Sequence, residues 1–151
     1  EPEEIIDLNT VVDDVRRNLS AAIQDSGADL VVDELPKISG YRTELIRLFQ
    51  NLIENSIKFR SDEPLRIEIG GARDSERLIV SVSDNGIGIP SEFHKRIFGV
   101  FQRLHGRDSY EGTGIGLAIC QKIVSQMGGR IWVQASENGG CTFRFTIPDD
   151  K

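Results

Sequence analysis

The sequence has few cysteines and no cluster of basic residues. Cys120 and Cys141 are isolated in a helix-like and a strand-like segment, and neither belongs to a C-x-x-C motif. This pattern favours buried thiols over a disulfide or a metal site. Lys and Arg number 18 against 24 Asp and Glu, which gives a formal net charge of −6. We expect no nucleic-acid partner, because phosphate backbones are bound by clustered Lys and Arg.

Long apolar segments are missing as well. No run approaches the roughly 18 apolar residues that span a bilayer, and there is no signal peptide, so we expect a cytoplasmic protein without membrane contact. The 151 residues suffice for one domain with a core. Glu1 is followed by Pro2, and Met127 is the only methionine. We therefore expect residues 1–151 to be a single domain taken from a longer chain.

The apolar residues are periodic and indicate a mixture of helices and strands. Helices are predicted from Asp7 or Asn9 to Gly27, over 44–59 and over 115–127, with a short one near 93–97. Strands are predicted at 4–6, 30–32 and near 38, and as two hairpins, 65–69 with 78–82 and 130–135 with 142–147. Each hairpin strand has one apolar and one polar face. This predicts an α/β fold, a two-layer sandwich of a mixed β-sheet with its helices on one face.

The predicted helix 44–59 carries a polar stripe opposite its apolar face. Its members follow steps of three, four, four and three residues: Glu44, Arg47, Asn51, Asn55 and Lys58. One interpretation is a solvated helix face. Asn is a mediocre helix former, however, so two aligned Asn residues favour a functional role. An Asn carbonyl oxygen suits Mg²⁺, and a nearby Lys suits phosphate.

Two glycine-rich motifs follow. Residues 84–90, DNGIGIP, come directly after a predicted strand. A tight turn would explain the glycines, but the carboxylate of Asp84 could also accept a hydrogen bond from the amine of adenine. Residues 112–117, GTGIGL, open the third predicted helix, where free amide groups form either a phosphate site or a simple helix start. Neither motif fits a P-loop or a Rossmann turn.

Taken in order, the motifs N-L-I-E-N-S-I-K-F, D-N-G-I-G-I-P, I-F-G-V-F-Q-R, G-T-G-I-G-L and G-G-C-T-F resemble the catalytic ATP-binding domain of sensor histidine kinases. The resemblance covers nearly the whole chain, and F-Q-R-L-H with Y-E-G-T-G-I-G-L-A-I-C is most similar to PAS- or phytochrome-linked kinases. It implies the Bergerat-type fold shared with gyrase, MutL and the ninety-kilodalton heat-shock chaperone. It also implies ATP and Mg²⁺ as cofactors.

The resemblance assigns roles by motif. It implies that Asn55 is the main Mg²⁺ ligand with Asn51 beside it, and that catalysis involves these two with Lys58 and Arg103. The residues implied to contact the nucleotide are Asn55, Lys58, Phe59, Asp84, Gly86, Gly88, Gly112, Thr113, Gly114, Gly116, Leu117 and Thr142. Phe98 and Phe101 match a box that anchors a lid over about residues 91–111, although core packing remains the alternative for both. Residues 138–140 depart from the usual glycine pattern.

The partners follow from the same resemblance. His94 and His105 are the two histidines, and we expect both to be exposed loop imidazoles. The implied acceptor of the γ-phosphoryl group is therefore a histidine on a separate dimerisation domain of the same protein, with a response regulator receiver domain as a further partner. The domain would be a monomer by itself and a homodimer in the full protein.

Two alternatives stay open. The first is an ATP-hydrolysing relative of gyrase or MutL. In those proteins the residue four positions before the Mg²⁺-binding Asn resembles a Glu that activates water. Here that residue is Asn51, whose amide cannot take a proton. The second is a non-catalytic nucleotide-binding switch or anti-sigma module.

Overall fold

The main feature is a mixed β-sheet with helices packed on one side. In the part of the chain that the computed structural model describes, residues 1–74, 76–99, 115–137 and 139–148, a five-stranded sheet has the order β2-β4-β5-β7-β6. Its strands are β2 (Asp29–Val32), β4 (Arg66–Arg73), β5 (Arg77–Asp84), β6 (Ile131–Ala135) and β7 (Cys141–Pro148). β2 and β4 are parallel, and the remaining neighbours are antiparallel. β1 (Glu4–Asp7) and β3 (Lys37–Gly40) form a separate antiparallel ribbon.

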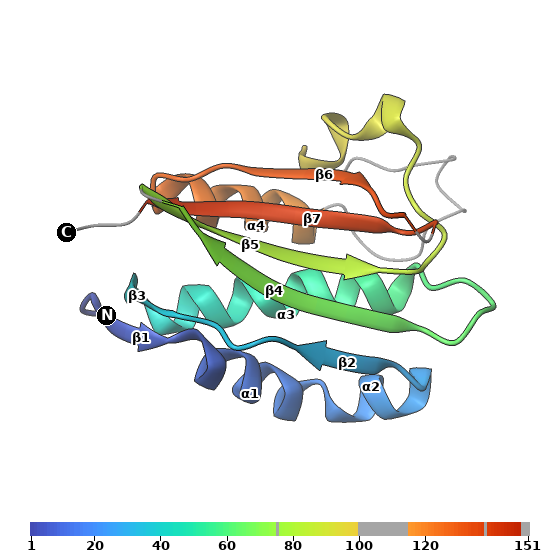
Figure 1. Ribbon diagram of the computed structural model, residues 1–151, viewed down its shortest axis with the longest axis horizontal. Coiled ribbons are helices and arrows are strands. Elements are labelled where there is room, and N and C mark those ends of the chain that lie inside the picture. Colours follow the sequence, from blue (N-terminus) through green and yellow to red (C-terminus); the bar gives the residue numbers. More distant parts are fainter. Residues whose placement is uncertain (75, 100–114, 138, 149–151) are drawn as a thin grey trace.

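The helices cover one face of this sheet. They are α1 (Leu8–Asn18), α2 (Ser20–Ser26), α3 (Arg42–Lys58) and α4 (Ile115–Gln126), with two 3₁₀ turns, η1 (Ser91–Phe93) and η2 (Arg96–Phe98). Figure 1 shows α3 and α4 behind the sheet, whose other face is turned toward the viewer. The predicted α/β sandwich with a mixed sheet is confirmed. Among the described helices, none is both long enough and apolar enough to cross a bilayer.

Two local predictions were wrong in detail. The first predicted helix is divided at Leu19, whose φ of −104° and ψ of 17° depart from helical values. Backbone hydrogen bonds from Leu19 to Val15 and from Ile23 to Leu19 nevertheless span the division, so the two helices follow one another directly. No side chain of α2 is fully buried, although Ala22 and Ile23 are partly buried and pack against the core. The helix predicted near 93–97 is instead the pair of 3₁₀ turns.

Strand alternation determines which residues face the helices. On β5 and β7 the side chains at alternate positions from Leu78 and from Phe143 are almost fully buried. The ring of Phe49 on α3 meets that of Phe145 edge-on, with centroids 5.7 Å apart. Phe98 of η2 meets Phe143 in the same way at 6.1 Å. Asp84, the last residue of β5, follows this alternation and therefore points toward the helix layer.

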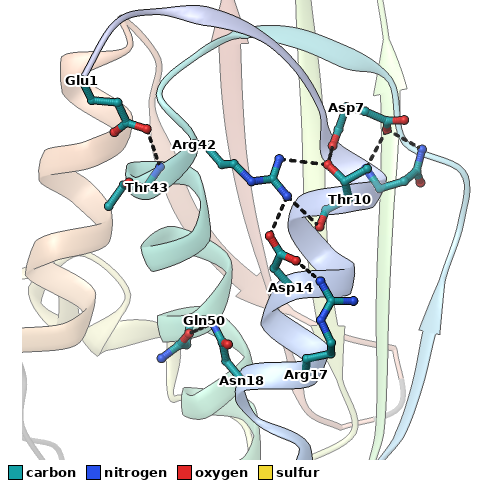
Figure 2. A network of polar contacts seen from close by, with 10 residues as sticks. Glu1, Asp7, Thr10, Asp14, Arg17, Asn18, Arg42, Thr43 and Gln50 are labelled. Atoms are coloured by element: carbon teal, nitrogen blue, oxygen red, sulfur yellow. Dashed lines mark hydrogen bonds and ion pairs between the residues drawn. The ribbon is translucent and has the colours of Figure 1, made fainter.

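A polar network joins α1 to the beginning of α3 (Figure 2). Arg42 donates to a carboxylate oxygen of Asp14 at 2.6 Å and to the hydroxyl of Thr10 at 3.0 Å, and Arg17 also contacts Asp14. The hydrogen bond from Arg42, assisted by the charges of both arginines, outweighs partial desolvation and holds the pKa of the Asp14 carboxyl below its ordinary value. This network fixes the N-terminal end of the helix that carries the Asn stripe.

Candidate functional site

A buried carboxylate lies where β5 ends. Asp84 is 5% exposed, and its two oxygens accept hydrogen bonds from three separate segments. Oδ2 accepts from the Ser56 hydroxyl of α3 at 2.8 Å. Oδ1 accepts from the backbone N–H of Gly86 at 2.9 Å and from that of Cys141 at 3.3 Å. The motif predicted Asp84, whereas Ser56 and Cys141 were not singled out as site residues.

Glycines let the backbone approach this carboxylate closely. A Cβ atom on Gly140 would lie 2.1 Å from the carbonyl oxygen of Asp84 and 2.6 Å from its Oδ1, so no side chain fits there. Gly88 has a φ of +78°, in the left-handed region that favours glycine. The intervening residue Ile87 donates its N–H to the carbonyl oxygen of Phe59, at 3.1 Å. The loop after β5 is thus tied to the end of α3.

Thr142, predicted to complete an adenine pocket, points to the other face of the sheet. Its hydroxyl lies 2.7 Å from that of Ser83 and 2.7 Å from that of Ser136. These residues line a hollow of about 380 Å³ on the face that the helices leave uncovered. The physical reason is strand alternation: Phe143 of β7 faces the core, so Cys141, two residues before it, shares that side and Thr142 does not.

Cys141, not the neighbouring Thr142, lies next to Asp84. Its Sγ lies 3.9 Å from Oδ2 of Asp84. Burial, together with the negative charge of Asp84, raises the pKa of the Cys141 thiol. The thiol therefore stays protonated and can act as a weak donor toward the carboxylate. The core-facing Phe143 two positions on was the sequence signal that could have identified Cys141 instead of Thr142.

The Asn stripe of α3 lies against the beginning of α4. A Cβ atom on Gly116 would stand 3.4 Å from the amide oxygen of Asn51, so the Asn51 side chain rests on the first turn of α4. Asn51 and Asn55 are both half-buried, and Lys58, at the end of the helix, is exposed. The side chain of Leu117 is buried in the core. The fold thus brings together Asn51 and Gly116, which belong to two separate motifs of the sequence.

Part of the predicted site lies outside the described residues. This holds for Phe101, Arg103, His105, Gly112, Thr113 and Gly114 and for much of the predicted lid, 91–111. Phe98 is described and packs in the core, 6% exposed. His94 differs from the expected exposed imidazole, since it is half-buried and its Nε2 lies 2.8 Å from the carbonyl oxygen of Ile89.

The donors available for a metal ion are amide oxygens. Within the described ranges, no group of three or more His, Cys, Asp or Glu side chains could hold a metal ion. Asn51 and Asn55 are one helical turn apart on α3, and their carbonyl oxygens are hard ligands. Mg²⁺ keeps several waters and is held by few protein groups together with substrate phosphates. The residues present fit such an ion.

Comparisons with known proteins agree with this geometry. Residues 40–151 match the family model described as "Histidine kinase-, DNA gyrase B-, and HSP90-like ATPase". Cyanobacterial phytochrome A of Nostoc sp. (strain PCC 7120 / SAG 25.82 / UTEX 2576) is 48% identical over 145 residues, which are 96% of this chain and 19% of that protein. The chain thus spans about a fifth of the length of the first curated relatives it matches.

Solved structures give the same result. The nucleotide-free catalytic domain of histidine kinase ThkA has a TM-score of 0.83 and 29% identity, with 99% of both chains covered. A structure of ThkA in complex with the response regulator protein TrrA has a TM-score of 0.80 and 28% identity, covering 98% of this chain and 42% of that chain. The relatives include a phytochrome, in line with the likeness of F-Q-R-L-H and Y-E-G-T-G-I-G-L-A-I-C to phytochrome-linked kinases.

Proposed function

The chain belongs to the family of histidine kinase-, DNA gyrase B- and HSP90-like ATPases, and we propose that it binds ATP with Mg²⁺ and donates the γ-phosphoryl group to a histidine on a separate dimerisation domain of the same protein. The observation that carries this proposal is the position of α3. Ser56 of this helix contacts Asp84 at the end of β5, while Asn51 rests on Gly116 at the beginning of α4. One helix therefore links a buried acceptor suited to adenine with a helix start suited to phosphates.

In this proposal Asp84 accepts a hydrogen bond from the adenine amine, with Cys141 beside it in place of Thr142. The glycines at 86, 88 and 140 let neighbouring backbone segments pack closely around the carboxylate and fix the loop that would border the base. Phe59, half-buried at the end of α3, lies along the nucleotide.

The phosphates extend from there toward Lys58 and the beginning of α4. Gly116 and Leu117 belong to that first turn, and Gly112, Thr113, Gly114 and Arg103 are assigned by the family resemblance alone. Asn55 and Asn51 would hold Mg²⁺, which when bound supplies neutralisation of charge on the transferred group.

In the transfer the protein mainly positions the γ-phosphoryl group and stabilises its charge, and it forms no covalent bond itself. A ring nitrogen of the acceptor histidine attacks the γ-phosphorus in line, a P–N bond forms, the bond to the β–γ bridging oxygen breaks, and ADP leaves. This chain orients the phosphates and withholds a base from water, because the amide of Asn51 cannot accept a proton. The arrangement therefore favours transfer over hydrolysis.

The partners are proposed on the same basis. The structure of ThkA with TrrA supports a response regulator receiver domain as the next acceptor. We further propose one domain over 1–151, a lid over about 91–111 held at Phe98, a monomer in isolation, a homodimer in the full protein and a cytoplasmic location. With a formal net charge of −6, no nucleic-acid partner is proposed.

The test is transfer between two separate polypeptides. The 151-residue chain is incubated with γ-labelled ATP and Mg²⁺, alone and with the two-helix histidine domain of its parent protein. We expect label on the histidine domain only, and loss of that label when its histidine is replaced by Gln. The Asn55→Ala variant serves as the inactive control. Rapid release of inorganic phosphate by the chain alone would contradict the proposal and favour an ATP-hydrolysing relative of gyrase or MutL.

A further inference from the structure

Ser56 is an unusual residue for its position on α3. Seven residues of this fully described helix are buried, namely Leu45, Leu48, Phe49, Leu52, Ile53, Ser56 and Ile57. Ser56 is the only polar one of the seven, and it is 1% exposed. Ala would fill such a site with a better helix propensity and without the cost of burying a hydroxyl. The hydroxyl therefore requires a partner, and Asp84 provides one at 2.8 Å.

The direction of this hydrogen bond is fixed by the carboxylate. Asp84 has two acceptor oxygens and no donor, so the Ser56 hydroxyl must donate. Oδ1 is already engaged by the two backbone N–H groups of Gly86 and Cys141. Oδ2 receives Ser56 and the weak thiol of Cys141 at 3.9 Å. The capacity that remains for a ligand donor is therefore concentrated on Oδ2.

We propose that Ser56 is a positioning residue for base recognition: its hydroxyl holds Oδ2 of Asp84 in the orientation that accepts a hydrogen bond from the exocyclic amine of adenine. This inference rests on the proposed function, since it assumes that Asp84 meets the base. Ser56 does not touch the nucleotide itself. It sets the plane of the carboxylate from α3, while the backbone N–H groups of Gly86, in the loop after β5, and of Cys141, on β7, hold the other oxygen.

The test compares ATP with purine riboside triphosphate, which lacks the 6-amino group but is otherwise the same ligand. Calorimetric titration of the 151-residue chain in the presence of Mg²⁺ gives both affinities. For Ser56→Ala we expect ATP affinity to fall by about tenfold, while affinity for the amine-free analogue stays within about twofold. Ser56→Cys, which retains a weak donor of similar size, should give an intermediate ratio.

A matched control separates positioning from packing. Ile53→Val removes one methylene from a fully buried site on the same helix and touches no hydrogen bond to Asp84. Thermal unfolding should show lowered stability for this variant, with the ratio of the two affinities unchanged.

Three results would overturn the inference. If Ser56→Ala weakens both ligands equally, the hydroxyl acts through general packing, and if it weakens neither, the carboxylate does not need it. If the unmodified chain already binds both ligands equally, Asp84 does not read the amine and the proposed base site fails with it. The first two results leave the proposed function intact, so the two failures can be told apart.

Discussion

Replacement of Asp84 by Asn should change which purine the site prefers. Two backbone N–H groups point at Oδ1, so the amide oxygen of the new side chain must lie there and its NH₂ group must lie at the position of Oδ2. Ser56, 2.8 Å away, can rotate its hydroxyl to accept from that NH₂. We therefore expect the variant to fold, with a loss of about 1–2 kcal/mol because its hydrogen bonds no longer involve a charged group.

The consequence for nucleotides follows from the swapped polarity. The amine of ATP would meet an NH₂ donor in place of a carboxylate, which should weaken binding by about 1.5–3 kcal/mol, or roughly 10- to 150-fold. Inosine triphosphate carries a 6-oxo acceptor, so Asp84→Asn should bind it more tightly than the unmodified chain does. Calorimetric titration with both nucleotides measures the switch, and Asp29→Asn, at a carboxylate that is 65% exposed, is the control. Equal loss for both nucleotides, or unchanged ATP affinity in a folded variant, would refute this assignment.

Three further predictions concern hydrolysis, the core and pH. Asn51→Glu should lower phosphoryl transfer to the histidine domain and raise release of inorganic phosphate at most modestly, because a base must also be aligned with water. A large rise in phosphate release would show that a carboxylate at this position is enough for hydrolysis. Phe49→Ala should cost about 3–5 kcal/mol in a urea titration, since the ring is fully buried, and a cost below about 1 kcal/mol would contradict the packing. The pKa of Asp14 is lowered in the fold, so its stabilising effect is complete above its ordinary value of 3.8 and is lost as the pH falls through the folded value. Both Asp14→Asn and Arg42→Gln should therefore reduce the fall of the urea midpoint as the pH is lowered. If the midpoints of the variants and of the unmodified chain run parallel over the acid range, the pair does not contribute to stability.

Local sequence patterns were enough to predict the hairpins, the helix 44–59 and the place of Asp84 at a strand end, because each depends on the period of nearby side chains. The choice between Cys141 and Thr142 depended on which face of β7 meets the core, and the alternation from Phe143 could have given it. The contact of Ser56 with Asp84 joins residues 28 apart in the sequence, and nothing local pairs them. The division of the first helix at Leu19 also escaped prediction, since the apolar positions of the predicted helix continue through Leu19 and Ile23.

The parallel pairing of β2 with β4 covers the first half of β4. Residues 29–32 align with residues 66–69, so the first segment of the chain occupies the border of the sheet formed by the later hairpins. The matched family model begins only at residue 40. A chain trimmed to that boundary would leave the backbone groups of β4 unpaired beside the apolar side chains of Ile67 and Ile69, and it should self-associate in sedimentation experiments. The four-residue β2 thus stands at the edge of the sheet in place of the eight-residue β4, and a short edge strand offers less backbone for edge-to-edge aggregation.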